Sequence, residues 1–294
     1  MNFHIISEND KKIFEKYNIN NQRSAYNFTT NYIWCGKDKL QVCVEDDYLF
    51  IFWNIGKHSR MLYPKGYGEN KKAAISKACD YMLEKGINPK FTHLSEEDVL
   101  EMRNFFGDNF IFELDRDGSD YIYETQKLIT LSGKKLHSKK NHLNSFRKNN
   151  EFIYRSIEEK DIPNCKALFE LWYNDKEEIT KLMPESRIAT YKLLDNIQTL
   201  NLKSGLIEIN GNIVACTVGE KITSDTALIH VEFANTTFNG SYAAINQQFV
   251  ENEWSDTTFI NREEDMGNAG LRKAKESYQP IKLLNSYTAT LKTN

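Results

Sequence analysis

The order of elements along this sequence constrains its fold most, because the same order occurs twice. The second half reads as a strand, two helices, three strands, a helix, a strand, a helix and a closing strand region, and the first half follows that order. The three consecutive strands of the second half are expected at residues 205–209, 212–220 and 226–234, with Asn210-Gly211 as a tight turn between the first two. No repeat is visible residue by residue. The repetition therefore predicts two modules of similar architecture.

The length of the chain agrees with two modules, since 294 residues are about twice the size of a typical domain. Hydrophobic residues make up 40% of the sequence, which is enough to build cores and too much for a disordered chain. We expect an N-terminal module at residues 1–132, a basic connecting segment at residues 133–150 and a C-terminal module at residues 151–294.

Charge and cysteine content limit the classes of function. The formal net charge is −3, from 38 Lys and Arg against 41 Asp and Glu, which excludes an overall basic surface. The first residues lack the apolar core of a signal peptide, and no apolar run approaches the ~20 residues of a bilayer span. Five cysteines without a C-x-x-C pair and six histidines without ligand spacing predict neither a disulfide framework nor a metal site. These features predict a protein of the reducing cytoplasm.

One segment of the chain is wholly basic. Residues 133–148 carry five lysines, one arginine and two histidines, and no acid. If this segment is helical, Leu143 and Phe146 anchor it and its cations face outward. Such a patch could hold tRNA phosphates or an anionic membrane surface, with an affinity that falls as salt rises. The alternative is a solvated linker helix. The candidate anion- or tRNA-binding residues are Lys135, His137, Lys139, Lys140, Asn141 and Arg147.

Two polar residues alternate with apolar ones on the strand expected at residues 226–234. His230 and Glu232 lie on the face opposite three apolar side chains. A partly buried carboxylate is suited to accept a proton from an attacking amine or hydroxyl, which makes Glu232 a candidate general base. The alternatives are a half-buried, hydrogen-bonded histidine and an ion pair between Glu232 and Arg262 or Arg272.

A dense charge cluster follows the strand expected at residues 257–261. It consists of Arg262, Glu263, Glu264 and Asp265, and loops at strand ends commonly carry the chemistry of α/β proteins. Residues 267–270 (Gly-Asn-Ala-Gly) then open a helix, whose first backbone N–H groups could hold an anion.

The helix after this cluster has two expected faces. Leu271, Ala274 and Tyr278 form its inward stripe, and Arg272, Lys275 and Glu276 share another face. An arginine and a lysine beside a helix N-terminus are suited to clamp a phosphate or an aminoacyl ester. A solvated helix face with a capping loop is the alternative.

These stretches resemble a known family. The order of elements is that of the GNAT acyltransferase fold, and its two copies suggest a tandem GNAT architecture, an α/β (α+β) fold whose mixed, mostly antiparallel sheets are flanked by helices. The sequences FINREEDMGNAGLRKAKESYQP at residues 259–280, LSGKKLHSKKNHLNSF at residues 131–146 with the preceding Tyr123, and HVEFAN at residues 230–235 carry the likeness. They are similar to the C-terminal soluble domain of bacterial phosphatidylglycerol lysyltransferases and its stand-alone relatives.

The resemblance implies transfer of an aminoacyl group from aminoacyl-tRNA to an amine or hydroxyl acceptor, such as a lipid head group or a small molecule. It also implies an active C-terminal module and a degenerate N-terminal one. In GNAT-like folds the fourth strand, here that of Glu232, borders the acyl cleft and commonly carries the base. The candidate catalytic residues are Glu232, Glu263 and Asp265. The candidate substrate-binding residues are Asn261, Arg262, Arg272, Lys275, His230 and Asn235. The transferred amino acid, the acceptor and the oligomeric state stay open.

Two further functions fit the sequence less closely. An acetyl-CoA-dependent N-acetyltransferase normally has a Gln/Arg-x-x-Gly-x-Gly/Ala loop whose backbone amides hold the pyrophosphate. Residues 63–68 (Tyr-Pro-Lys-Gly-Tyr-Gly) and 238–243 (Phe-Asn-Gly-Ser-Tyr-Ala) match it loosely, and a plain strand-to-helix turn accounts for each. The second alternative is a non-catalytic module that binds RNA or anionic lipid through residues 133–148.

Overall fold

The computed structural model describes residues 1–17, 20–36, 39–174 and 183–293, and it divides into two compact units. Unit 1 comprises Met1–Asp120, Glu264–Asn268 and Leu284–Asn294, and unit 2 comprises Tyr121–Glu263 and Ala269–Leu283. The compact units therefore do not follow the predicted boundaries at residues 132 and 150, and the basic segment lies within unit 2. The reason is that a long strand at residues 110–124 begins in unit 1 and ends in unit 2, and the closing strand returns the chain to unit 1.

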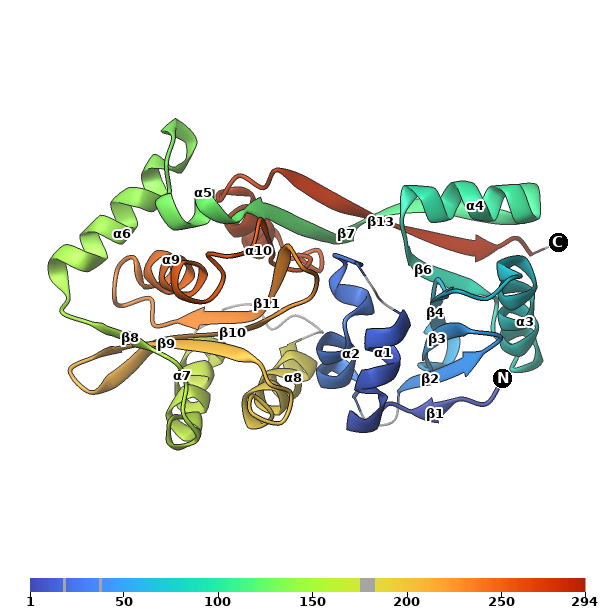
Figure 1. Ribbon diagram of the computed structural model, residues 1–294, viewed down its shortest axis with the longest axis horizontal. Coiled ribbons are helices and arrows are strands. Elements are labelled where there is room, and N and C mark those ends of the chain that lie inside the picture. The colour runs from blue at the N-terminus through green and yellow to red at the C-terminus, as the bar shows by residue number, and fades with distance from the viewer. Residues whose placement is uncertain (18–19, 37–38, 175–182, 294) are drawn as a thin grey trace. The chain divides into compact units, whose positions relative to one another are not determined.

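Unit 1 contains a mixed sheet with helices (Figure 1). Its strands are ordered β1-β2-β3-β4-β6-β13, with β5 beside β3, and only β4 and β6 pair in parallel. Its elements are β1 (His4–Ile5), α1 (Lys11–Tyr17), α2 (Phe28–Trp34), β2 (Leu40–Glu45), β3 (Tyr48–Trp53), β4 (Arg60–Leu62), β5 (Lys65–Gly66), α3 (Lys71–Glu84), β6 (Lys90–Leu94), α4 (Glu96–Phe106) and the end of β13 (Lys282–Leu291).

Local sequence explains where the helices of unit 1 begin. The side chain of Asn70 accepts from the N–H of Ala73 at the start of α3. The sequence Ser-Glu-Glu-Asp at residues 95–98 predicts the start of α4, and the structure confirms it as a capping box, in which Ser95 and Asp98 each accept the other's backbone N–H. Phe50 and Phe52 of β3 pack with Ile75 of α3 in the core.

The strands of unit 2 also pair in a mixed arrangement, and Figure 1 shows α9 on one face of them and α7 with α8 on the other. Its strands are ordered β7-β12-β11-β10-β9-β8, and only β11 and β12 pair in parallel. Its elements are the end of β7 (Phe110–Glu124), α5 (Thr125–Thr130), α6 (His137–Asn149), β8 (Ile153–Arg155), α7 (Ile162–Asn174), α8 (Met183–Asp195), β9 (Lys203–Ile209), β10 (Asn212–Lys221), β11 (Thr226–Ala234), α9 (Ser241–Glu253), β12 (Phe259–Asn261), α10 (Ala269–Glu276) and the start of β13.

The strand pairing confirms the predicted fold class, because in each unit the strands pair in a mixed, mostly antiparallel arrangement flanked by helices. The turn at Asn210 and Gly211 has positive φ at both residues (49° and 77°), as a tight hairpin of this kind requires. The sequence also predicts two strands at residues 110–115 and 121–125 around a turn at Asp117-Gly118, but the structure has one strand, β7, that passes through this position. It further predicts a mostly helical stretch at residues 177–200, of which residues 177–182 lie outside the described residues and α8 covers Met183–Asp195.

A β-bulge interrupts the pairing of β10 with β11. Val218 pairs with Val231 and Gly219 with Ile229, so His230 has no direct partner on β10. A Cβ at Gly219 would lie 2.5 Å from the carbonyl oxygen of Leu228, which explains the glycine. Bulges re-aim side chains, and this one lies beside both predicted polar residues of β11, His230 and Glu232.

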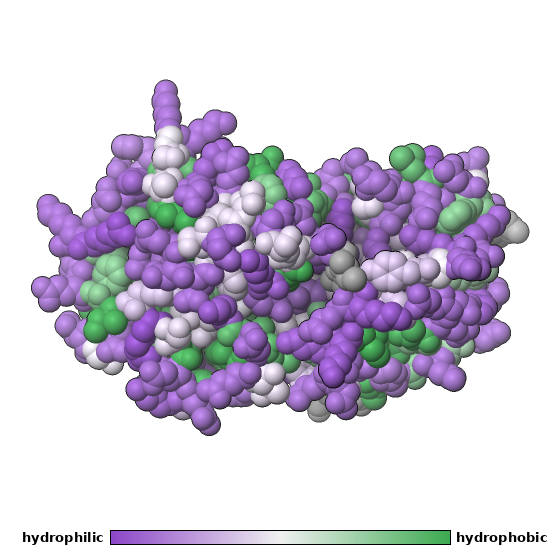
Figure 2. All heavy atoms as spheres, in the orientation of Figure 1, coloured by the Kyte–Doolittle hydropathy of each residue, from purple (hydrophilic) through white to green (hydrophobic). Residues whose placement is uncertain are grey.

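The surface is mostly polar on the face shown in Figure 2, where apolar residues form small separate patches. Within the described ranges, no helix combines the length and the apolar character that crossing a bilayer requires.

Candidate functional site

A buried ion pair joins β11 to the segment after β12 in unit 2. Arg262 Nη2 donates to Glu232 Oε1 at 3.0 Å, and the two side chains are only 12% and 7% exposed. Asn246 of α9 donates from Nδ2 to the other oxygen, Glu232 Oε2, at 2.9 Å. Burial lowers the pKa of Arg262, but Glu232 and neighbouring tyrosines more than offset it, so this pKa lies above its ordinary value. The guanidinium is therefore charged.

Aromatic rings surround the guanidinium of this pair. The Arg262 guanidinium carbon lies 4.8 Å from the ring centre of Tyr278 and 5.7 Å from that of Tyr123. Lys139 of α6 places its Nζ 4.4 Å from the same Tyr278 ring. Burial raises the pKa of both tyrosines well above the ordinary value, so both phenols stay neutral at physiological pH. Two cations of unit 2 thus share one neutral aromatic ring.

A pocket of about 220 Å³ adjoins this group at the start of α9. Lys139 and Tyr278 belong both to the cation group and to the pocket wall. Burial lowers the pKa of Lys139, and the nearby Arg262 lowers it further. The described lining residues include no Asp or Glu, so the pocket favours an anion or an electron-rich group. We call Glu232, Arg262, Asn246, Tyr123, Tyr278 and Lys139, together with this pocket, the candidate site.

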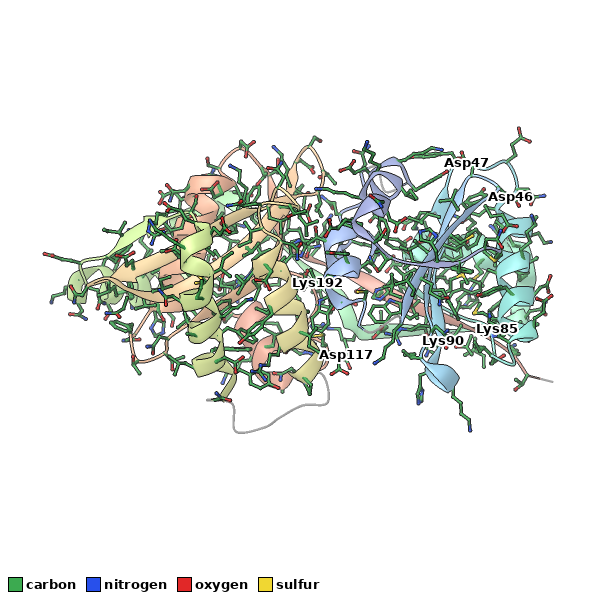
Figure 3. All side chains as sticks on the ribbon, turned by 90° about the horizontal axis from the view of Figure 1, so that it is seen from below. Asp46, Asp47, Lys85, Lys90, Asp117 and Lys192 are labelled. Atoms are coloured by element: carbon green, nitrogen blue, oxygen red, sulfur yellow. The ribbon has the colours of Figure 1, made fainter. Side chains whose placement is uncertain are left out.

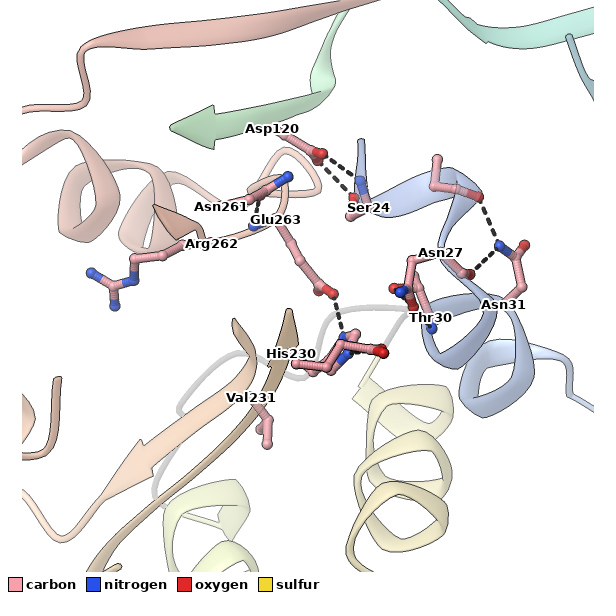
Figure 4. Close-up of polar contacts among 12 residues, drawn as sticks. Ser24, Asn27, Thr30, Asn31, Asp120, His230, Val231, Asn261, Arg262 and Glu263 are labelled. Atoms are coloured by element: carbon pink, nitrogen blue, oxygen red, sulfur yellow. Dashed lines mark hydrogen bonds and ion pairs between the residues drawn. The ribbon is translucent and has the colours of Figure 1, made fainter. Parts of the chain in front are cut away.

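His230 does not join the candidate site, although it was predicted to bind substrate. Its ring lies between two carboxylates, with Nδ1 3.0 Å from Glu263 Oε1 (Figure 4) and Nε2 3.0 Å from Glu220 Oε1. The side chain is fully buried. Burial alone would lower the pKa of His230, but the hydrogen bonds to both glutamates raise it to about 9. His230 is therefore an imidazolium whose two N–H groups donate to fixed carboxylates.

The other two predicted catalytic carboxylates are also engaged. Glu263 holds His230 and has a positive φ of 56°, with its N–H donating to Asn261 Oδ1 at 2.7 Å. Asp265 is fully buried in unit 1, where it accepts from Arg116 Nη1 at 3.1 Å. Of the three predicted catalytic carboxylates, Glu232 is the one bonded to residues of the candidate site, Arg262 and Asn246.

The predicted faces of α10 are partly wrong. Lys275 was expected on the outer face with Arg272 and Glu276, but its side chain is buried and its Nζ donates to the carbonyl oxygen of Arg262 at 2.6 Å. Ala274, expected inward, is exposed, whereas Tyr278 is buried as expected. The carbonyl at the end of β12 needs a donor, and a buried lysine supplies it. Lys275 thus supports the backbone of Arg262, and Arg272 is half-buried on α10.

Asn235 and Asn261 serve the backbone. The side-chain oxygen of Asn235 accepts from the N–H and the hydroxyl of Thr237, which shapes the turn before α9. Asn261 is fully buried and accepts from Glu263, as described above. Both residues position neighbouring segments.

The basic segment is helical, and the predicted anchors Leu143 and Phe146 are buried. Lys139 does not face outward as expected, since it is half-buried and its Nζ reaches the Tyr278 ring, whereas Arg147 is exposed as expected and its Nη2 donates to Gln247 Oε1 at 3.0 Å. Lys140 donates to the Thr130 carbonyl, and Asn141 contacts His137 at the exposed surface. The exposed lysines of the segment are Lys134, Lys135, Lys140 and Lys148.

The glycines of the loose CoA-like loops have a packing role. In unit 1, a Cβ at Gly66 or Gly68 would lie 2.2 or 2.1 Å from the carbonyl oxygens of Asp47 and Asp46, in the β2–β3 turn (Figure 3). The adjacent cavity of about 420 Å³ is lined by the acidic Asp46, Asp47 and Glu69, which repel a pyrophosphate. In unit 2, a Cβ at Gly240 would lie 2.2 Å from the carbonyl oxygen of His142. Backbone packing accounts for each of these glycines.

Sequence reasoning missed Asn246, which is fully buried on α9 and holds Glu232. One signal pointed to it. Asn246 follows Ala243 by three residues and precedes Phe249 and Val250 by three and four, so it occupies a core position of the helix. A polar side chain at such a position needs a buried partner. Among the described residues, no group of three or more His, Cys, Asp or Glu side chains is placed to hold a metal ion.

Solved structures with this fold include tandem acyltransferases. A conserved protein of unknown function from Bacteroides thetaiotaomicron is 32% identical, with 99% of each chain covered and a TM-score of 0.92. L-PGS from Bacillus licheniformis is 16% identical, with 99% of this chain and 93% of that chain covered and a TM-score of 0.69. A tandem GNAT protein from the clavulanic acid biosynthesis pathway is 9% identical, with 100% and 99% covered and a TM-score of 0.52. The last two likenesses concern the fold, which is the GNAT-like tandem fold.

Sequence comparison identifies the family. An uncharacterized protein of Mycoplasmoides gallisepticum is 28% identical over 172 residues, which are 58% of this chain, and the match spans only 55% of that relative's length. The sequence model described as "Phosphatidylglycerol lysyltransferase, C-terminal" matches residues 17–290. The chain belongs to the family of phosphatidylglycerol lysyltransferase C-terminal domains.

Proposed function

We propose that unit 2 transfers an aminoacyl group from aminoacyl-tRNA to an amine or hydroxyl of a lipid head group or small molecule in the cytoplasm. The observation that carries the proposal is the buried Arg262–Glu232 pair, enclosed by tyrosine rings beside a pocket without acids. Such a site offers a fixed cation for a developing oxyanion and a carboxylate for a proton in one place. Membership of the family supports the same chemistry.

The proposed reaction has one bond formed and one broken. The acceptor nitrogen or oxygen attacks the ester carbonyl carbon, and negative charge develops on the carbonyl oxygen, where Arg262 stabilises it. Glu232 takes the proton that the acceptor loses. The bond from the carbonyl carbon to the ribose oxygen then breaks, and that proton passes to the ribose oxygen. The low exposure of both side chains strengthens each electrostatic interaction.

The exposed lysines of residues 133–148 support tRNA as the donor. Lys134, Lys135, Lys140 and Lys148 lie on or beside α6, the helix that also brings Lys139 to the pocket. tRNA phosphates bound by the exposed lysines would therefore be held by α6, the same helix that lines the pocket of the candidate site. Anionic lipid head groups carry the same phosphate chemistry, and a lipid acceptor is compatible with this surface.

The experiment compares donors and a base variant. Labelled aminoacyl-tRNA and labelled acetyl-CoA are each supplied with candidate acceptors, and transfer is expected from the tRNA ester alone. Transfer falls at least about tenfold in Glu232→Gln, because the acceptor's proton loses its base. Glu208→Gln is the matched control, since Glu208 also pairs with an arginine of unit 2, Arg155, at 3.0 Å. Transfer from acetyl-CoA, or equal transfer in Glu232→Gln and wild type, would contradict the proposal.

A further inference from the structure

Two polar atoms of the candidate site have no hydrogen-bond partner among the described residues. They are Oδ1 of Asn246 and Nη1 of Arg262, and both are buried. Each belongs to a side chain whose other end is bonded to the Glu232 carboxylate. An unpaired acceptor and an unpaired donor therefore belong to the two side chains that are bonded to this carboxylate. Unpaired buried polar atoms cost free energy, and in an active site a ligand commonly supplies the partner.

The orientation of the Asn246 amide follows from its neighbour. An ionised carboxylate only accepts hydrogen bonds, so the amide nitrogen must face Glu232 Oε2, at 2.9 Å, and the amide oxygen must face away from it. In the same way, Nη2 of Arg262 donates to Glu232, and the N–H groups of Nη1 have no hydrogen-bond acceptor among the described residues. Because the Glu232 carboxylate accepts from both side chains, the unpaired atom of Asn246 must be an acceptor and the unpaired atom of Arg262 must be a donor.

We propose that Asn246 Oδ1 and Arg262 Nη1 recognise the α-amino acyl group of the donor. The α-ammonium donates to Asn246 Oδ1 beside the negative Glu232, and the ester carbonyl oxygen accepts from Arg262 Nη1. This inference rests on the proposed function and adds to it the feature that separates an aminoacyl donor from any other acyl donor. A plain acyl group has no ammonium, and it would leave the acceptor on Asn246 unpaired.

The charges around the site fit an ammonium at one point only. Arg262 and Lys139 are cations, and both stack on Tyr278 rather than on Asn246. Glu232 is the carboxylate bonded to both Asn246 and Arg262. The α-ammonium is therefore best accommodated on the Asn246 side of Glu232, opposite the guanidinium, where like charges do not meet. This arrangement also presents the carbonyl to Arg262, as the transfer requires.

Calorimetry with two stable donor analogues tests the proposal. The first is 3′-alanylamino-3′-deoxyadenosine, and the second is 3′-propionylamino-3′-deoxyadenosine, which differs only in lacking the α-ammonium. The small alanyl side chain makes the comparison independent of which amino acid is transferred. Wild-type protein is expected to bind the alanyl compound at least about tenfold more tightly, because the other leaves Asn246 Oδ1 unpaired. Asn246→Leu should reduce that preference to about twofold or less, because it removes the acceptor.

The control is Asn252→Leu, the same change on the exposed side of α9, which should keep the wild-type preference. Asn246→Ala is measured as well, since it also removes the acceptor but adds no apolar bulk, and a melting curve confirms folding. A preference retained in both folded Asn246 variants overturns the inference while the aminoacyl donor stands. Equal binding of the two compounds by wild type overturns it too, and points to a buried water between the two atoms. Binding of neither compound by wild type contradicts the proposed donor itself.

Discussion

At the scale of single residues, two histidines show how the surroundings of a ring decide its charge. His230 lies between Glu220 and Glu263, and its pKa is raised to about 9 against the effect of burial. His93 of unit 1 is half-buried with a positive φ of 57°, and desolvation of its ring lowers its pKa to about 4. One is therefore a permanent cation and the other a permanent neutral ring near pH 7. Both are structural, and neither is a proton shuttle at that pH.

The pH dependence of stability follows from the raised pKa of His230. Below about pH 6.5 both folded and unfolded chains carry the proton, so its stabilising effect is complete. Between about pH 6.5 and 9 the unfolded chain loses the proton and the folded chain keeps it, so the free energy of unfolding falls, by at most about 3 kcal/mol. An NMR titration of the His230 ring should have its midpoint near pH 9.

Urea unfolding of unit 2 gives the energetic counterpart. Wild-type protein should lose stability from pH 6.5 to 9, and His230→Gln should be less stable at pH 6.5 and lack most of that slope. His137→Gln, at an exposed position of α6, is the matched control and should keep the wild-type slope. A His230 midpoint near pH 6.5, or an unchanged slope in His230→Gln, would show that the two glutamates do not hold an imidazolium.

At the scale of elements, close backbone approaches fix the helices around the pocket. Gly240 precedes α9 with a φ of 89°, and a Cβ there would lie 2.2 Å from the carbonyl oxygen of His142 on α6. The contact holds the start of α9 against the basic helix. Lys139 on α6 and Tyr242 on α9 line the same pocket, so this contact helps to set its width.

Gly240→Ala should therefore be much more destabilising than an ordinary glycine substitution. We expect a loss of about 3 kcal/mol or more, from the clash with His142 together with the left-handed backbone. Gly211→Ala is the control, because its φ is 77° but nothing lies within 4 Å of the added Cβ. Gly211→Ala should lower the free energy of unfolding by about 1–2 kcal/mol. Equal losses in urea unfolding would mean that the α6–α9 contact does not depend on glycine.

Local sequence signals predicted most helices, strands and turns, because the start and type of such an element depend on residues that are close in sequence. The Ser95 capping box, the Asn210-Gly211 turn and the order of strands and helices in each half belong to this class. The faces of α10 could not be predicted, because periodicity assigns Ala274 inward while the carbonyl of Arg262, distant in sequence, requires Lys275 there. Asn246 was missed for the same reason: its partner Glu232 lies on another element.

At the scale of the whole molecule, charge is distributed unevenly. The net charge of −3 coexists with residues 133–148, which contain no acid. Lys139 of this segment is half-buried against Tyr278, whereas Lys134, Lys135, Lys140, Arg147 and Lys148 are exposed and can meet outside partners. An RNA partner would therefore bind to a small basic surface on a protein whose total charge is close to neutral, and its affinity should fall strongly as salt rises.

Neutralising two of these lysines tests the RNA-binding surface. In Lys135→Ala/Lys140→Ala, tRNA affinity should fall, and the slope of log K against log salt should decrease by about 1.5–2, one counterion step per lost phosphate contact. Lys85→Ala/Lys90→Ala, two lysines of unit 1 labelled in Figure 3, is the charge-matched control and should keep the slope. If both double variants change the slope equally, binding is diffuse and does not use residues 133–148.

The proposed transfer depends most on Arg262, the residue that pairs with Glu232 and stacks on Tyr278. Its removal would leave Glu232 buried and unpaired, so Arg262→Lys, which keeps the charge and loses the second N–H arm, is the better variant. Arg155→Lys alters a second arginine–carboxylate pair of unit 2, with Asp161, and serves as the control.

The decisive measurement is the single-turnover rate of aminoacyl transfer from charged tRNA in these two folded variants. We predict at least about a tenfold lower rate in Arg262→Lys and a rate near wild type in Arg155→Lys, because only Arg262 faces the developing oxyanion. An unchanged rate in Arg262→Lys would contradict the assignment of the active site to this buried pair.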